Sequence, residues 1–252
     1  MGAVHFTIDP ELVRELAQAL PLSTFVETGT FEGLAVQTVR TFFDTLYTVE
    51  LSDQYFASAA ERFGNDPAVH VCHGNSPLFL ERLAPVLKDT SALYWLDAHW
   101  CMADGTLADV PQCPLLGELE AIESLNAQSV LLIDDARLFL CPPPAPHQVA
   151  DWPSFDSILS ALRRLSAIHQ IMVVNDVIVY FPSAIIDAMS KYAVAHAVDW
   201  LAVLNAFKQQ TVWETERDAH LEGINRHRQD VDAYQHTTKR LLVTVLRALR
   251  LV

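Results

Sequence analysis

The sequence predicts an α/β protein with a doubly wound, mostly parallel seven-stranded sheet and a helical extension at its C-terminal end. Five short apolar runs are each followed by a helical pattern, and two further runs on either side of residue 175 form a hairpin. Alternating strands and helices are typical of parallel sheets, and the hairpin adds one antiparallel strand near the sheet edge. We therefore expect a sheet domain in residues 1–182 and a helical extension in residues 183–252.

The expected elements follow one another through mostly short connections. Asp9 caps the first helix, Pro10 occupies its first position, and Leu12 and Leu16 lie on its apolar face. Strands are expected at residues 24–27, 45–50, 69–72, 92–96, 129–133, 170–174 and 177–181. The helices between them are expected at residues 34–43, 54–63, 77–87, 115–125 and 155–165.

Two connections are longer than a compact domain needs, residues 99–114 and residues 141–153, and the second contains five prolines. Both follow the C-terminal ends of strands, where open α/β sheets bind their ligands. They are candidate walls of a substrate site, with stiff surface loops as the alternative. Trp100 and Trp152 lie in these connections and are candidates for stacking on an acceptor or for burial.

Composition narrows the class of protein. The 252 residues are 51% hydrophobic and carry a net charge of −14, and the first two hundred contain no basic stripe, so nucleic acid is not an expected partner. Four cysteines without a CxxC pair suggest neither a disulfide framework nor a zinc knuckle. No apolar run reaches the roughly 18 residues of a membrane span. These features predict a cytoplasmic protein.

The end of the chain differs chemically from the rest. Residues 214–236 are polar on nearly all sides, whereas residues 237–252 combine an apolar stripe with four basic and no acidic residues. The extension is expected to form a homo-oligomer, to bind a partner protein, or to cap the sheet. Contact of its last stripe with an acidic membrane surface is a further possibility.

Glycines and carboxylates mark a candidate ligand cradle at the strand ends. Gly29 and Gly33 occupy the first strand-to-helix turn, and Gly74 ends the third strand. Glycine permits a tight turn and a close approach of the backbone to a ligand. Glu27 lies at the end of the first strand, and Glu50 ends the second, where a carboxylate accepts both hydroxyls of a ribose.

The spacing between Gly29 and Glu50 would also suit a dinucleotide-binding enzyme, which is the alternative class of protein. However, the turn from Gly29 to Gly33 lacks the GxGxxG pattern that binds pyrophosphate at a helix N-terminus. Acidic Glu27 and Glu32 would also repel phosphates. The sequence therefore favours an adenosyl ligand that carries a sulfonium and no phosphate.

These residues, with Gly74-Asn-Ser76, resemble motifs I, II and III of class I S-adenosylmethionine methyltransferases over roughly residues 20–182. The resemblance implies that Glu27 and Gly29 lie near the methionine part, Glu50 near the ribose, and Asn75 and Ser76 near the adenine. Phe31 stands where a glycine is often found, and Asn75 where aspartate is common. The candidate cofactor-binding residues are Glu27, Thr28, Gly29, Thr30, Gly33, Glu50, Ser52, Asn75, Ser76 and Asp97.

The ends of the fourth and fifth strands carry Asp97, His99, Asp134 and Asp135. Three neighbouring carboxylates repel one another unless a positive group lies between them. Hard divalent cations prefer such oxygen ligands. The three aspartates resemble the metal ligands of metal-dependent sugar O-methyltransferases of the macrocin O-methyltransferase type, which implies Mg²⁺ or another divalent cation. In the same resemblance, His99 occupies the position of the catalytic base.

We therefore predict an S-adenosylmethionine-dependent methyltransferase that O-methylates a small-molecule or carbohydrate acceptor by one in-line displacement, with His99 and Asp97 as catalytic residues. A metal-free site is the alternative: Asp97 then contacts the cofactor only, Asp134 caps the next segment, and His99 is a packed side chain. Arg137 is expected to pair with Asp135. An inactive methyltransferase-like module that serves assembly or recognition through its tail is the alternative function.

Overall fold

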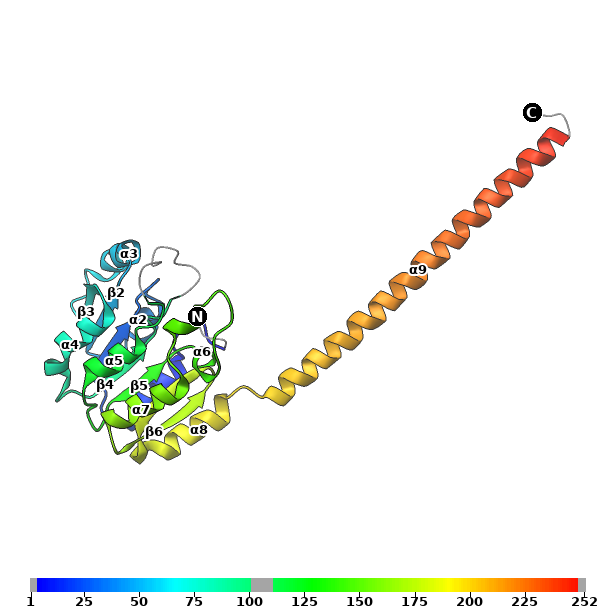
Figure 1. Ribbon diagram of the computed structural model, residues 1–252. Helices are drawn as coiled ribbons and strands as arrows, with labels where there is room; N and C mark the ends of the chain where they lie inside the picture. Colours follow the sequence, from blue (N-terminus) through cyan, green and yellow to red (C-terminus); the bar gives the residue numbers. More distant parts are fainter. Residues whose placement is uncertain (1–3, 101–110, 249–252) are drawn as a thin grey trace. The chain divides into compact units, whose positions relative to one another are not determined.

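The computed structural model describes residues 4–100 and 111–248, and the chain divides into two compact units, Met1–Ala197 and Val198–Val252. Every strand found in these described residues lies in the first unit (Figure 1). They are β1 (Thr24–Thr28), β2 (Thr45–Glu50), β3 (Val69–His73), β4 (Ala92–Leu96), β5 (Val130–Ile133), β6 (His169–Val174) and β7 (Val177–Pro182).

Helices and 3₁₀ turns connect these strands. The helices of the first unit are α1 (Pro10–Ala19), α2 (Leu34–Val39), α3 (Asp53–Phe63), α4 (Ser76–Leu87), α5 (Leu115–Ile122), α6 (Arg137–Leu140), α7 (Phe155–Leu165) and α8 (Ile186–His196). The 3₁₀ turns are η1 (Val149–Asp151) and η2 (Ser183–Ile185).

The predicted fold class is confirmed by the sheet, whose strand order is β3-β2-β1-β4-β5-β7-β6. Strands β1 to β5 pair in parallel, and β7 is antiparallel to both of its neighbours. Asn175 and Asp176 join β6 to β7 with φ of 50° and 71°, the left-handed conformations that a two-residue type I′ hairpin requires. Because the strands are parallel, the C-terminal ends of β1, β2 and β4 meet at one edge.

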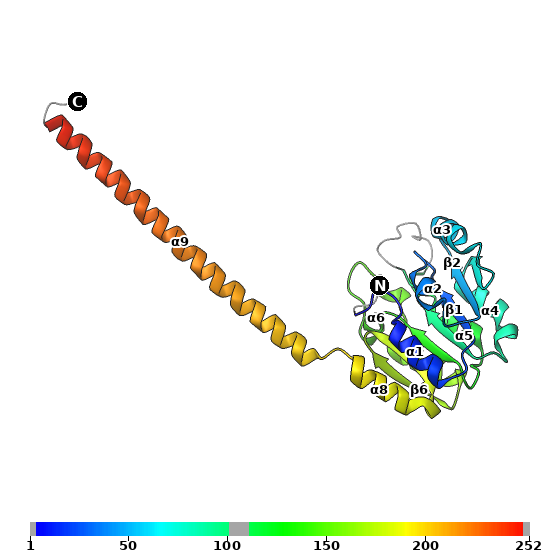
Figure 2. The ribbon, with the colours of Figure 1, turned by 180° about the vertical axis from the view of Figure 1, so that it is seen from behind.

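Each face of the sheet has its own hydrophobic core. Apolar residues of α1, α2, α3 and α8 pack on one face, which Figure 2 shows in front, and those of α4, α5 and α7 pack on the other. Both faces are therefore shielded from water, which explains why every residue of β1 and of β4 is buried.

Two helices are shorter than predicted. Helix α2 ends at Val39, four residues before the expected end at Phe43, because Phe42 N–H donates to Val39 O in a turn that brings Phe43 against Phe25 in the core, with ring centroids 5.6 Å apart. Helix α5 ends at Ile122 rather than at residue 125, because Glu123 has a φ of 55°, which interrupts a right-handed helix.

The predicted domain boundary at residues 182/183 is corrected to 197/198, because α8 belongs to the first unit. The buried Tyr192 of α8 donates its hydroxyl hydrogen to Asp9 Oδ2 at 2.5 Å, while Asp9 Oδ1 caps α1 by accepting from Glu11 N–H. Asp9 therefore links the first helix of the unit to the last one.

The second unit consists of α9 (Trp200–Ala248), a helix of 49 residues whose described side chains are almost all exposed. Within the described residues, no helix combines the length and apolarity that crossing a membrane requires. The last residues of the predicted basic stripe, 249–252, and one of the four cysteines, Cys101, lie outside the described part of the chain.

Replacing Tyr192 by Phe removes the hydrogen bond to Asp9 and leaves the buried ring in place. We expect the free energy of unfolding to fall by about 1.5–3 kcal/mol, the usual contribution of a hydrogen bond to a charged group. Urea denaturation of the wild-type and variant chains measures the loss. Asp9→Ala should cost more, because it also removes the α1 cap. An unchanged midpoint for both variants would contradict this role of Asp9.

Candidate functional site

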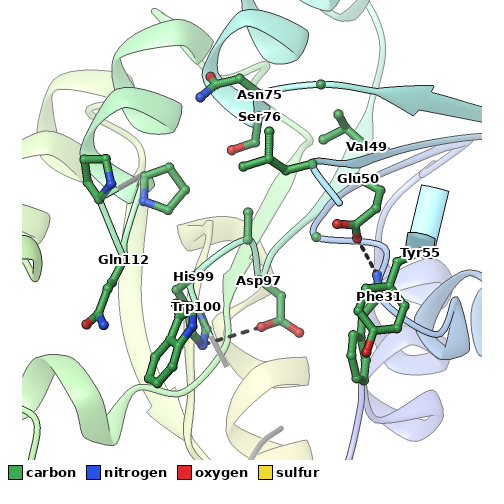
Figure 3. Close-up of a pocket in the computed structure, with 16 residues that line it drawn as sticks. Phe31, Val49, Glu50, Tyr55, Asn75, Ser76, Asp97, His99, Trp100 and Gln112 are labelled. Atoms are coloured by element: carbon green, nitrogen blue, oxygen red, sulfur yellow. Dashed lines mark hydrogen bonds and ion pairs between the residues drawn. The ribbon is translucent and has the colours of Figure 1, made fainter. Parts of the chain in front are cut away.

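A cavity of about 1050 Å³, counting its open mouth, lies at the C-terminal ends of β1, β2, β3 and β4. Figure 3 shows its wall, to which the first turns after these strands contribute. The lining residues are Gly29, Phe31, Val49, Glu50, Leu51, Tyr55, Gly74, Asn75, Ser76, Asp97, Ala98, His99, Trp100, Pro111, Gln112 and Pro114.

Gly29 allows the β1 turn to lie directly against the end of β4. Its φ is +83°, and a Cβ placed on it would lie 2.4 Å from the carbonyl oxygen of Asp97. Only glycine tolerates both the conformation and the contact. The same approach is fixed by a hydrogen bond of 3.1 Å from Asp97 N–H to Thr28 O. Asp97 therefore enters the cavity wall beside the glycine turn.

Glu50 is held in position by two backbone groups. Its Oε2 accepts from Phe31 N–H at 2.7 Å, drawn as a dashed line in Figure 3, and its Oε1 accepts from Ser52 N–H at 2.8 Å. A carboxylate has about four acceptor positions, so each oxygen keeps capacity for one further donor. Glu50 lines the cavity, and the ribose hydroxyls of a nucleoside are donors of the required kind.

Phe31 adopts a φ of 46°, in the left-handed region where glycine is favoured and other residues lose on the order of 1 kcal/mol. This conformation gives a physical reason for the glycine often found at this place in the motif. The ring of Phe31 lies 4.5 Å from that of Tyr55, and both rings line the cavity. Neither residue was among the predicted cofactor-binding residues, although Phe31 lies within the cradle motif.

The predicted cofactor residues divide into two groups. Those that line the cavity are Gly29, Glu50, Asn75, Ser76 and Asp97. The others, which are absent from its lining, are Glu27, Thr28, Thr30, Gly33 and Ser52. Glu27 is buried and accepts from the Thr48 hydroxyl, and burial raises the pKa of this carboxyl well above its usual value. Thr30 also contacts Thr48, at 2.5 Å.

The carboxylates that follow β4 and β5 form ion pairs with basic side chains of the same chain. His99 Nε2 lies 2.8 Å from Asp135 Oδ2 and 3.6 Å from Asp97 Oδ1. Arg137 donates to Asp135 Oδ1 at 2.5 Å and also pairs with Asp176. The predicted Arg137–Asp135 pair is confirmed, whereas the His99–Asp135 pair was not foreseen.

These ion pairs shift the acidity of both partners. Burial alone would lower the pKa of His99, but the hydrogen bond to Asp135 and the charges of the nearby aspartates outweigh it and raise the pKa. Burial alone would raise the pKa of Asp135, but His99 and Arg137 lower it. The arrangement therefore favours an imidazolium paired with a carboxylate.

Asp134 and Glu118 are buried carboxyls of a different kind. One oxygen of each, Asp134 Oδ2 and Glu118 Oε1, has no hydrogen-bond partner among the described residues. Burial, with the charges of Asp97 and Asp135, raises the pKa of Asp134 to about 8. Burial also raises the pKa of Glu118, which the sequence analysis did not single out. Asp134 does not cap α6, which begins after Ala136 without a side-chain cap.

The predicted metal ligands do not form a ligand set in this arrangement. Both oxygens of Asp135 are engaged by His99 and Arg137. Within residues 4–100 and 111–248, no group of three or more His, Cys, Asp or Glu side chains is placed to hold a metal ion. The divalent cation therefore stays a prediction from the sequence.

Gln112 links the two long connections. Its backbone O accepts from Trp100 N–H at 2.7 Å, and its Oε1 accepts from Gln148 N–H at 2.8 Å and from Trp152 Nε1 at 3.1 Å. Trp152 is buried and its ring lies 5.5 Å from that of His99, so it supports the site from behind. Trp100 lines the cavity. Residues 101–110 of the first connection lie outside the described residues.

Comparison with known proteins yields only distant structural similarities. No family model matches the chain, and no curated protein does. Similar solved structures include a candidate caffeoyl-CoA O-methyltransferase from Staphylococcus aureus, with 13% identity and a TM-score of 0.48 over 70% of this chain and 85% of that one. Another is S-adenosylmethionine-bound CalS10, an amino pentose methyltransferase from Micromonospora echinaspora, with 13% identity, a TM-score of 0.44, and coverage of 69% and 89%.

A third is the O-methyltransferase from Bacillus cereus in complex with S-adenosylhomocysteine, with 14% identity, a TM-score of 0.42, and coverage of 71% and 83%. Values this low assign no function. The class of protein rests instead on the chain itself: a doubly wound α/β sheet with a ligand cavity at the C-terminal edge of its strands.

Replacing Gln112 by Ala leaves the indole N–H of the buried Trp152 without its acceptor. We expect a loss of about 1–3 kcal/mol in the free energy of unfolding, the cost of an unsatisfied buried donor. Gln112→Glu keeps an acceptor at the same position and is the matched control. Denaturation followed by tryptophan fluorescence measures both variants. Equal stabilities of Gln112→Ala and Gln112→Glu would show that this acceptor does not hold the connections together.

Proposed function

We propose that the chain is an S-adenosylmethionine-dependent methyltransferase that methylates a hydroxyl of a small-molecule or carbohydrate acceptor. One observation carries the proposal: the cavity joins the Glu50 carboxylate, at the end of β2, to Asp97 and His99 after β4. The described lining contains no Lys or Arg. Such a wall favours a nucleoside without phosphates, as the sequence motifs also do.

Each part of the wall suits a different part of this cofactor. The free acceptor capacity of Glu50 matches a ribose diol, and the rings of Phe31 and Tyr55 offer apolar and aromatic surface beside it. Asn75 and Ser76, at the start of α4, line the same cavity, and the resemblance assigns them to the adenine. The Asp97 carboxylate favours a positive group, such as an amino group or a sulfonium.

The neutral form of the paired His99, which is populated above the raised pKa of the imidazole, is the proposed base. When bound, the cofactor supplies a methyl group activated by its sulfonium. Asp135 accepts the Nε2 hydrogen of His99 and fixes the ring, which leaves Nδ1 to take the proton of the acceptor hydroxyl. The hydroxyl oxygen then forms a bond to the methyl carbon as the carbon–sulfur bond breaks, which leaves S-adenosylhomocysteine and a protonated His99.

A divalent cation at Asp97, Asp134 and Asp135 is the further element that the sequence predicts. Neither the proton transfer nor the methyl transfer is assigned to it, because His99 and Arg137 already engage both oxygens of Asp135. Binding of the acceptor to an ion at Asp97 and Asp134 would require this network to rearrange.

Titration calorimetry with S-adenosylhomocysteine tests the proposed cofactor. We expect the wild-type chain to bind it, and Glu50→Gln to bind at least about tenfold more weakly, because each hydrogen bond to a charged group contributes about 1.5–3 kcal/mol. Glu120→Gln, at an exposed position of α5, is the matched control and should bind as the wild type does. Absence of binding by the wild-type chain would remove the proposal.

A further inference from the structure

Helix α9 carries a ladder of residues spaced alternately three and four apart, the spacing that places side chains along one seam of a helix. Its apolar members are exposed, with 72% of Trp200, 67% of Phe207 and 51% of Ile224 accessible. The ladder consists of Trp200, Val203, Phe207, Gln210, Glu214, Arg217, Leu221 and Ile224. Apolar residues thus occupy both ends of the seam, and polar ones its middle.

Most helices in proteins are stabilised chiefly by burying an apolar face, and less by the propensity of their own residues. The seam of α9 would be buried by a second helix that carries the same spacing. The chain itself provides such a helix in a second copy. What remains to be decided is the direction in which the two copies pair.

Charge decides against a parallel pair. In a parallel two-stranded coiled coil, each ladder residue meets its own counterpart, so Glu214 would face a second Glu214 and Arg217 a second Arg217. Two layers of like charge would then lie in the centre of the seam. The parallel arrangement therefore places the polar residues where they oppose association.

In an antiparallel pair whose two helices cross at residue 212, each ladder residue faces a chemically compatible residue of the second copy. Trp200 then meets Ile224 of the second copy, and Val203 meets its Leu221, so that apolar side chains face apolar ones. Phe207 meets Arg217 of the second copy, a pair suited to a cation–π contact. Gln210 meets Glu214 of the second copy, and its amide N–H is a donor for that carboxylate.

From this self-complementarity we propose that α9 is an interaction surface for a second copy of the same chain, paired antiparallel over residues 200–224. The resulting interface is isologous, as in most symmetric dimers, because each layer occurs twice. This inference is independent of the methyltransferase proposal, since no residue of the ladder lines the cavity at the strand ends.

Light scattering on the full-length chain measures the assembly state. We expect a mass of twice 28.1 kDa for the wild type. Val203→Asp should weaken association at least tenfold, because it places a carboxylate opposite Leu221 of the second copy. Val212→Asp is the matched control, because Val212 is equally apolar and exposed on the same helix but lies off the ladder, and it should remain dimeric.

The proposal would be overturned if the wild-type chain stayed monomeric at all concentrations, whether or not it binds anionic vesicles. Equal effects of Val203→Asp and Val212→Asp on association would also overturn it. An unchanged urea-denaturation midpoint of the sheet unit in Val203→Asp shows that the variant is folded. Failure of cofactor binding in the wild type would count against the proposed function alone.

Disulfide trapping tests the direction of the pair. A mixture of Val203→Cys and Leu221→Cys chains should form a disulfide between residues 203 and 221, identified by mass spectrometry of the linked peptides. Each variant alone should form far less of the disulfide between like positions. Dominant 203–203 or 221–221 disulfides would show a parallel pair and overturn the antiparallel arrangement.

Discussion

The site depends on the ion pair between His99 and Asp135, which joins the chain segments that follow β4 and β5. Carboxylates at both strand ends would repel one another in a buried setting, and the chain compensates them with His99 and Arg137. With its ring fixed in this way, His99 lies at the cavity wall beside Asp97. Together with Arg137, this pair engages both oxygens of Asp135, so a further cation would compete with two positive groups that are already in place.

Backbone contacts fix the other ligand-facing parts of the cavity wall. The turn at Gly29 lies against the backbone of Asp97, and Glu50 is oriented by two backbone N–H groups, one of them from Phe31. The cavity is therefore largely preformed, because its polar groups are fixed by contacts within the protein. The two long connections are fixed in the same way, because Gln112 accepts hydrogen bonds from both Trp100 and Trp152.

The sequence was sufficient for the fold, because apolar periodicity, the Asp9 cap and the Asn175-Asp176 hairpin each act locally. It was not sufficient for contacts between distant segments. The turn that ends α2 and the packing of α8 on α1 depend on tertiary contacts of Phe43 and Tyr192, which no local pattern reveals.

For the site, the sequence located the strand-end carboxylates, His99 and the pair of Arg137 with Asp135, but not the pair of His99 with Asp135. Three aspartates suggested a metal ion because the sequence does not show that His99 also reaches Asp135. Tyr55 was missed because the position of a side chain at the start of α3 depends on the turn that precedes it. Five of the ten predicted cofactor residues line the cavity, and the other five are absent from its lining.

The ion pair also links stability to pH. Because the folded-state pKa of His99 is raised, the contribution of the pair to stability is complete below about pH 6.5, the unfolded value, and is lost as pH rises through the folded value. An NMR titration of His99, assigned by its loss in His99→Gln, is the most direct measurement of this pair. The account predicts a pKa above about 6.5 that falls in Asp135→Asn. A wild-type pKa at or below 6.5, unchanged in Asp135→Asn, would contradict it.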